Sequence, residues 1–224
     1  MKSQSHHAPG ALFRVCLLAA CVVAAPGRVA TAQASEGHGD VTWNSRSLDV
    51  RWLKRVHEAD SPWVRYPLQA AHRSAWPVFM LSVPTALAVS ETTGSWSSSD
   101  VAALGVSAVL AGGGAVVLKR IFRRDRPYVT HAFVDPYHSR AGGDPTGRLL
   151  SDSASMPSGH ASLAASLAVS SMLSHPRPAI IAIGSTWAAS VALSRVWLGV
   201  HYPSDILVGS LLGASVAAAV HIVR

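Results

Sequence analysis

Cysteine is nearly absent from this sequence, and the two that occur, Cys16 and Cys21, both lie near the amino terminus. The rest of the chain therefore has neither a possible disulfide nor a cysteine metal site. Charge is also scarce, since Asp, Glu, Lys and Arg make up 14% of the 224 residues, against about 25% in an average soluble protein. Strand-like alternation of apolar and polar residues is missing too, which argues against a β fold and leaves an all-α architecture.

Apolar residues are abundant instead, at 49% of the chain with a mean hydropathy of +0.27. They gather in five stretches, at about residues 75–90, 101–118, 161–173, 178–193 and 206–223. We predict an all-α helical bundle with about five membrane-spanning helices. Several stretches are shorter than the ~20 residues that cross a bilayer, so buried helices of a soluble all-α domain are the alternative.

The amino terminus has the pattern of a secretory signal. Basic residues precede an apolar run at 15–25, and the small-residue sequence Ala30-Thr31-Ala32 follows. We predict a signal peptide at 1–32, cleaved after Ala32. A lipoprotein signal with lipidation at Cys21 and an uncleaved anchor are the alternatives, and all three direct the chain into or across a membrane of the cell envelope.

Residues 33–74 are polar, with Trp43, Trp52 and Trp63 interleaved among Arg and Lys. Such a segment suits a membrane interface, where indole rings and basic side chains both find partners. A solvated helix packed on the domain is the alternative. A second glycine-rich and polar stretch, at 130–157, predicts a long loop.

The first motif is a basic cluster, because five of the 19 Lys and Arg residues lie within 119–126. Lys119, Arg123 and Arg126 are spaced i, i+4, i+7, so a helix would place three cations on one face. Pro127 then ends the helix. Concentrated positive charge predicts an anion site, and a positive flank that anchors a membrane helix is the alternative.

The second motif, Pro157-Ser158-Gly159-His160, comes directly before an apolar run. Ser158 can cap a helix there, and Gly159 lets a ligand approach the backbone closely. Free N–H groups and the helix dipole would then face a phosphate, with His160 at the rim. An ordinary helix start is the alternative.

The third motif is Ser194-Arg195, followed by His201 and Asp205. Across a helix start, Asp205 can reach the imidazole of His201 and fix its tautomer, which leaves the other ring nitrogen able to react. The alternatives are a capping aspartate beside a buried histidine, or a metal site, which would need at least one more ligand.

Together the three motifs resemble the signature of the type 2 phosphatidic acid phosphatase (PAP2) superfamily, which is related to bacterial class A non-specific acid phosphatases and vanadium haloperoxidases. Its blocks are Lys-x6-Arg-Pro, Pro-Ser-Gly-His and Ser-Arg-x5-His-x3-Asp, and every fixed position is matched here. The resemblance spans 119–205 by motif, and it implies a PAP2-like phosphatase domain at 75–224.

The resemblance also implies a mechanism without metal or cofactor. His201 would form a phosphohistidine, Asp205 would orient it, and His160 would protonate the leaving oxygen. The residues implied to hold the phosphoryl oxygens are Lys119, Arg126, Ser158, Gly159 and Arg195. The cluster's remaining arginines, at 120, 123 and 124, fall at variable positions of the block, and we expect them to give electrostatic support or to contact the membrane surface.

The expected substrate is a lipid phosphate or diphosphate, such as phosphatidic acid, phosphatidylglycerol phosphate, a polyprenyl diphosphate or a lipid A phosphate. A soluble secreted acid phosphatase of broad specificity is the main alternative, and a non-catalytic membrane protein or transporter ranks below it. No nucleic-acid partner is expected, because no fold signature accompanies the basic charge. Counting crossings across the five stretches places all three motifs on one face, which is the outer face if the amino end is exported.

Overall fold

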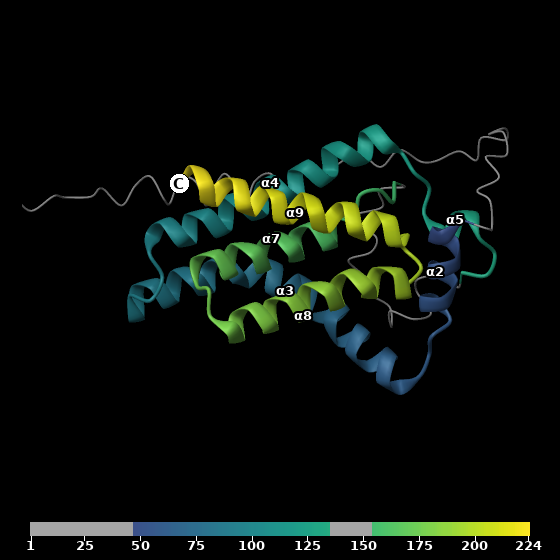
Figure 1. The fold of residues 1–224 in the computed structure, drawn as a ribbon, viewed down its shortest axis with the longest axis horizontal. Coiled ribbons are helices and arrows are strands. Elements are labelled where there is room, and N and C mark those ends of the chain that lie inside the picture. The colour runs from purple at the N-terminus through teal and green to yellow at the C-terminus, as the bar shows by residue number, and fades with distance from the viewer. Residues whose placement is uncertain (1–46, 135–153) are drawn as a thin grey trace, which may run out of the picture. The chain divides into compact units, whose positions relative to one another are not determined.

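The computed structural model describes residues 47–134 and 154–224. The predicted signal peptide, most of the predicted loop at 130–157 and the start of the polar segment lie outside the described residues. Within those residues the chain is helical and has no strand, which confirms the all-α bundle (Figure 1). The helices are α2 (Leu48–His57), α3 (Pro62–Thr93), α4 (Ser98–Phe122), α5 (Pro127–Thr130), α7 (Gly159–Ser174), α8 (Pro178–Trp197) and α9 (Pro203–Val223).

Local sequence explains where several of these helices begin and end. Proline occupies the first position of α3, α5, α8 and α9, where its missing N–H costs no helical hydrogen bond. At the start of α4, the hydroxyl of Ser97 accepts from the backbone N–H of Asp100, whose carboxylate accepts from the backbone N–H of Ser97, both at 3.1 Å. Gly94, with φ of 64°, ends α3 in the left-handed conformation.

Helix α3 begins earlier than the apolar pattern indicates. The boundary expected between residues 74 and 75 falls inside this 32-residue helix. Its first turns, at 62–74, mix apolar residues with polar ones such as Arg65, Gln69 and His72, so they do not register as one apolar run. Pro67, Pro77 and Pro84 lie within the helix, which continues through all three.

Helix α7 occupies the middle of the bundle and contacts α4, α8 and α9 (Figure 1). Its packing against α9 depends on two glycines that allow backbone to approach backbone. A Cβ at Gly209 would collide with the carbonyl oxygen of Ser158, and one at Gly213 with that of Ser162. The core around α7 is built from small and aliphatic side chains such as Ala164 and Leu167.

Three of the described helices are long and apolar enough to cross a membrane, namely α4, α8 and α9. Large apolar side chains on their surfaces are exposed, including Val117 on α4, Ile183 on α8 and Leu211 on α9. An outward-facing apolar surface is what a lipid environment favours. The total of five spans remains a prediction.

Candidate active site

The basic cluster is divided between two helices, contrary to the prediction of one helical face. Helix α4 ends at Phe122, and Arg123 turns the chain with a left-handed φ of 46°. Lys119 therefore lies in the last turn of α4, whereas Arg126 is the N-cap of α5. The three-cation helical face is wrong, because the backbone changes direction between its members. The side chain of Arg123 is exposed, and its Nε–H donates to the carbonyl of Arg120.

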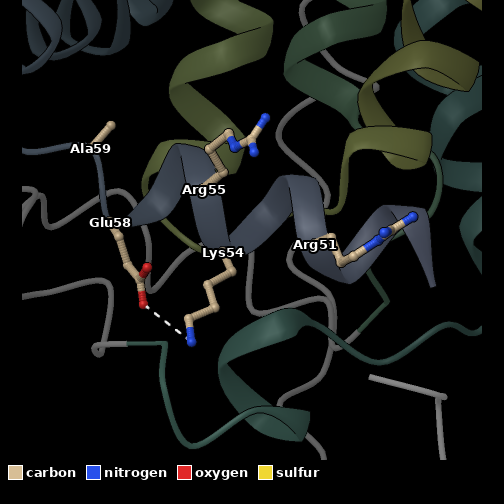
Figure 2. Close-up of a pocket in the computed structure, with 5 residues that line it drawn as sticks. All are labelled: Arg51, Lys54, Arg55, Glu58 and Ala59. Carbon is tan, nitrogen blue, oxygen red and sulfur yellow. Dashed lines mark ion pairs between the residues drawn. The ribbon is translucent and has the colours of Figure 1, made fainter. Parts of the chain in front are cut away.

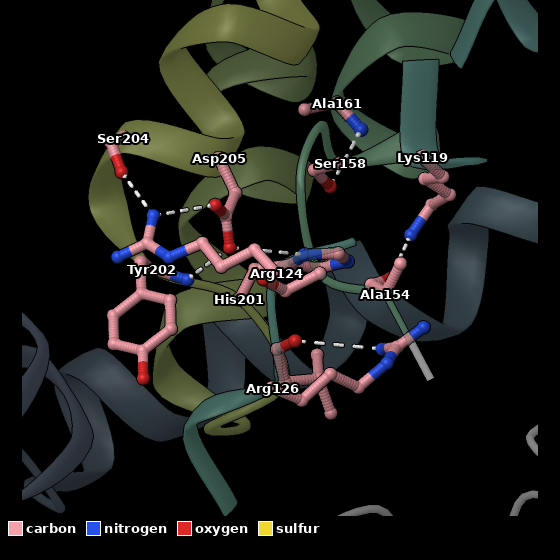
Figure 3. Close-up of polar contacts among 12 residues, drawn as sticks. Lys119, Arg124, Arg126, Ala154, Ser158, Ala161, His201, Tyr202, Ser204 and Asp205 are labelled. Carbon is pink, nitrogen blue, oxygen red and sulfur yellow. Dashed lines mark hydrogen bonds and ion pairs between the residues drawn. The ribbon is translucent and has the colours of Figure 1, made fainter. Parts of the chain in front are cut away.

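Hydrogen bonds join the three motifs, which are far apart in sequence. The backbone N–H of Ser155 donates to the carbonyl of Arg124 at 2.6 Å, and that of Ser158 donates to the carbonyl of Asp205 at 2.9 Å. Lys119 donates from Nζ to the carbonyl of Ala154. Figure 3 shows Lys119, Ser158 and Asp205 around His201. The structure therefore brings all three motifs to one end of the bundle.

The second motif forms the amino end of α7. Ser158 is buried and is the N-cap, and its hydroxyl accepts from the backbone N–H of Ala161 at 3.4 Å. Gly159 and His160 follow in the first turn, where backbone N–H groups have no partner within the helix. Trp76 and Phe79 of α3 contact the ring of His160 edge-on, with centroid separations of 5.8 and 5.7 Å. These contacts hold the imidazole at the rim of the helix start.

The third motif connects the end of α8 with the start of α9. The carbonyl of Arg195 accepts from the backbone N–H groups of Val200 and His201, and Gly199 makes the turn with φ of 70°. His201 is 3% exposed, and Asp205, in the first turn of α9, is fully buried. This turn places the imidazole inside the protein.

Asp205 lies beside His201 without a hydrogen bond between their side chains. The distance from His201 Nδ1 to Asp205 Oδ2 is 3.6 Å, which is close enough for a charge interaction. Oδ2 instead accepts from the backbone N–H of Tyr202 at 2.8 Å. The carboxylate therefore caps α9 and faces the imidazole at the same time.

The surroundings of His201 favour a neutral imidazole. Burial lowers its pKa well below the usual value of 6.5, because removal from water disfavours the charged form. The positive charges of Arg126, Lys119 and Arg195 lower the pKa further, in that order. A buried, neutral ring nitrogen surrounded by three cations has the features of a nucleophile facing an anion.

Three further residues belong to the contact network of the site, and none of them was predicted from the sequence as a site residue. His72 of α3 is buried, and its Nδ1 lies 2.9 Å from a guanidinium nitrogen of Arg195. Arg124, expected only to support the charge, donates to Asp205 Oδ1 at 2.9 Å and to Asp49 of α2 at 2.7 Å. Neither His72 nor Asp49 falls in a motif, and no local pattern marks them.

Within residues 47–134 and 154–224, no group of three or more His, Cys, Asp or Glu side chains is placed to hold a metal ion. A separate shallow recess runs along α2, and no motif residue lines it (Figure 2). Its lining residues are Arg51, Lys54, Arg55, Glu58 and Ala59. Lys54 and Glu58 form an exposed ion pair there at 3.8 Å.

The fold and site define a helical protein with histidines and cations gathered at one end of the bundle. A family model described as the PAP2 superfamily matches residues 100–224, which is more than half of the chain. The chain belongs to the PAP2 superfamily.

Curated relatives match part of the sequence. The chain is 37% identical over 118 residues to decaprenylphosphoryl-5-phosphoribose phosphatase of Mycobacterium tuberculosis, which covers 52% of this chain and 56% of the relative. The Mycolicibacterium smegmatis protein of that name is 36% identical over 140 residues, with coverages of 62% and 64%. An undecaprenyl-diphosphatase of Sulfolobus acidocaldarius is 43% identical over 60 residues, or 27% of this chain and 29% of the relative. The chain thus spans only part of the length of the relatives it matches.

Two crystal structures have a similar fold. LpxE of Aquifex aeolicus gives a TM-score of 0.61 at 21% identity, covering 78% of this chain and 94% of that one. A transmembrane PAP2-type phosphatidylglycerolphosphate phosphatase of Bacillus subtilis gives 0.53 at 21% identity, with coverages of 95% and 93%. At this identity the likeness concerns the fold alone.

Proposed function

We propose that this protein is a membrane-bound phosphatase that hydrolyses a lipid-linked phosphate monoester or diphosphate through a phosphohistidine at His201. The observation that carries the proposal is the setting of His201, an imidazole whose pKa is lowered by burial and lowered further by the charges of Arg126, Lys119 and Arg195. Three fixed cations can neutralise the equatorial oxygens of a transferring phosphoryl group, which is the main requirement of this chemistry.

In the first step, a ring nitrogen of His201 attacks phosphorus in line, and an N–P bond forms while the P–O bond to the leaving group breaks. Burial, followed by the charges of Arg195 and His201, lowers the pKa of His160, and the negative charge of the bound phosphate offsets this effect. The protonated His160 then gives its proton to the leaving oxygen. In the second step His160, now neutral, takes a proton from water, whose oxygen attacks the phosphohistidine and releases inorganic phosphate. Asp205 balances the positive charge that the His201 ring carries in the intermediate.

Binding of the phosphoryl group uses side chains and backbone together. Lys119, Arg126 and Arg195 supply positive charge, and the first-turn N–H groups at Gly159 and His160 supply donors. Ser158 contributes by shaping that turn, since its own backbone N–H donates to the Asp205 carbonyl. This arrangement uses eight of the eleven fixed positions of the three motifs, all except Pro127, Pro157 and Ser194, with no metal ion or cofactor in the mechanism.

The substrate class follows from the setting of the site and from the relatives. Apolar helices of membrane-spanning length would hold the site at the level of lipid headgroups. Two relatives are named for decaprenylphosphoryl and undecaprenyl substrates, which supports a polyprenyl-linked phosphate over a glycerolipid. We place the site on the outer face of the membrane. Phosphate release from an impermeant substrate by intact cells, as fast as by lysed cells, is the expected result, and latency until lysis would contradict it.

The segment around α2 and the start of α3 is proposed to lie at the membrane interface. Trp63 is 90% exposed, and the guanidinium of Arg55 lies over the ring of Trp52 at 5.4 Å. Replacing Trp63 with Ser should slow turnover of a lipid substrate but not of a soluble aryl phosphate. Equal effects on both substrates would contradict an interfacial role.

The decisive experiment compares membranes that contain wild-type protein or His201→Ala, with EDTA present. Phosphate release is measured on a polyprenyl diphosphate, phosphatidic acid and a water-soluble aryl phosphate. Release that survives EDTA and disappears in the variant is expected, with the polyprenyl substrate turned over fastest. Equal release by both proteins, or loss with EDTA, would refute the proposal. Activity on the aryl phosphate alone, in protein extracted without detergent, would favour a soluble acid phosphatase.

A further inference from the structure

We infer that Asp49 and Arg124 form a positioning pair that holds Asp205 beside His201, so that α2 is part of the catalytic assembly. The inference rests on the proposed function. Asp49 lies outside residues 100–224, the part of the chain that the family model matches. Neither residue occupies a fixed position of the three motifs.

Arg124 is the centre of this network. One of its terminal nitrogens, Nη1, donates to Asp205 Oδ1 at 2.9 Å and to the hydroxyl of Ser204 at 2.7 Å. The guanidinium carbon lies 3.7 Å from the centroid of the Tyr202 ring, so the plane also stacks on an aromatic face. A planar fork with several fixed donors can serve both contacts at once, which a lysine ammonium cannot reproduce.

Asp49 completes the network from the first turn of α2. Its Oδ2 accepts from the other terminal nitrogen of Arg124 at 2.7 Å and from the hydroxyl of Ser204 at 2.6 Å. Its Oδ1 accepts from the backbone N–H of Ser204 at 2.9 Å. Ser204 is the second residue of α9, so Asp49 caps α9 from a different helix.

The α2 helix is itself attached firmly to the bundle. The side chain of His57 donates from Nδ1 to the carbonyl of Trp197 at 2.8 Å, and the indole N–H of Trp197 donates to the carbonyl of Ala59 at 3.1 Å. Leu53, on the same helix, is fully buried. Asp49 is therefore presented by a fixed element rather than by a loose segment.

The result is a carboxylate held at both oxygens. Arg124 holds Asp205 Oδ1, while the backbone N–H of Tyr202 holds Oδ2, the oxygen that faces His201. Because Asp205 is fully buried, water cannot readily replace the Arg124 contact. Loss of either member of the pair would let the carboxylate rotate away from the imidazole, and small misplacements of this kind can cost about 100-fold in rate.

Figure 3 shows that Arg124 and Lys119 lie on different sides of His201. The Arg124 guanidinium lies with Tyr202, Ser204 and Asp205, whereas Lys119 lies on the opposite side of the histidine. Arg124 thus contacts the supporting carboxylate, and the role inferred for it is positioning rather than phosphate binding. Its replacement should consequently lower kcat and leave KM nearly unchanged.

The test compares Asp49→Asn, Arg124→Lys and the double variant with two matched controls, Asp60→Asn and Arg73→Lys, which replace exposed residues. The full-length protein is assayed in detergent with an aryl phosphate, alongside wild type and His201→Ala. We expect each single variant to lower kcat by about 10- to 100-fold with KM within about threefold. The double variant should be no worse than the poorer single variant, because both changes break one network. The controls should match wild type.

Three results would overturn the inference. The first is a kcat for Asp49→Asn and Arg124→Lys equal to that of the controls. The second is a loss of activity that comes from a higher KM rather than a lower kcat. The third is a double variant in which the two losses of kcat multiply. If Asp49→Asn does not fold, Arg124→Lys is judged by the same split between kcat and KM. A wild-type protein no more active than His201→Ala would instead refute the proposed function, and the inference with it.

Discussion

Gly209 of α9 lies against the carbonyl group of Ser158, so closely that a Cβ at position 209 would collide with the carbonyl oxygen. Gly209→Ala must therefore push α9 away from the turn that carries the second motif. We expect a loss of about 1–3 kcal/mol in unfolding free energy, as for other overpacked sites, together with a lower kcat. Thermal unfolding in detergent and aryl phosphate turnover measure the two effects.

The matched control for this change is Gly113→Ala in α4, because a Cβ there would meet no other atom within 4 Å. Alanine favours helix over glycine, so stability should stay equal or rise slightly. Equal behaviour of the two alanine variants would show that α9 does not position the second motif through Gly209.

His72 is expected to keep Arg195 in place. Because a guanidinium has no acceptor, the Nδ1 atom of His72 must accept the 2.9 Å hydrogen bond, which puts the imidazole proton on Nε2. His72→Leu removes this acceptor and should raise KM by at least roughly tenfold, since a charge-assisted hydrogen bond contributes about 1.5–3 kcal/mol. His72→Asn can place an oxygen near the position of Nδ1 and should recover part of the loss.

A histidine on α9 provides the comparison. His221 also makes a side-chain hydrogen bond, to Ser170 at 3.0 Å, but it lies near the end of α9 that is opposite to Asp205. His221→Leu should leave KM unchanged. Identical kinetics for His72→Leu and His72→Asn would contradict a role for the Nδ1 acceptor.

The fold was accessible from sequence because the main signals are local. Apolar runs without strand alternation predicted helices, and α4, α7, α8 and α9 each contain one of the predicted stretches. The start of α3 could not be predicted, because polar residues interrupt the apolar ones in its first turns and an internal proline does not reveal whether a helix stops or continues. Tertiary packing decides that question.

For the site too, residues within a local motif could be predicted from the sequence, whereas contacts between distant residues could not. Ser158, His201 and Asp205 stand in contiguous motifs, and the structure brings those motifs together. The prediction that the basic cluster forms one helical face was wrong, because it required the helix to continue past Arg123. The contacts of Arg124 with Asp49 and of His72 with Arg195 join residues 75 and 123 positions apart. The periodicity and spacing of residues in a sequence do not reveal contacts between residues so far apart.

Asp205→Asn tests whether the charge of this side chain matters beyond its cap. The amide keeps one acceptor but adds a donor where both Arg124 and the Tyr202 N–H already donate. It also removes the negative charge beside the proposed phosphohistidine. We expect kcat to fall by at least about 100-fold, in the range seen when a group that orients a catalytic histidine is neutralised.

Asp100→Asn is the control for this variant. Asp100 occupies the same position in α4, three residues after the N-cap, and pairs with Arg224 at 2.6 Å. Its replacement should lower the melting temperature while leaving kcat unchanged. A comparable loss of kcat in both variants would mean that Asp205 serves only as a helix cap.

The lowered pKa of His201 predicts that the folded protein loses stability in acid. Between its lowered folded pKa and about 6.5, the unfolded state binds a proton at this histidine and the folded state does not. Unfolding therefore becomes more favourable as the pH falls below about 6.5, and stability is retained above it.

Thermal unfolding at pH 7.5 and pH 5 should give a lower melting temperature at pH 5, and the difference should be smaller in His201→Gln, which cannot take up the proton. Orthovanadate, an anion of the size of phosphate, should raise the melting temperature of wild type at pH 5 more than that of the variant, because negative charge beside the ring favours the protonated imidazole. An unchanged pH difference in His201→Gln would mean that His201 takes up its proton in the folded state as readily as in the unfolded one.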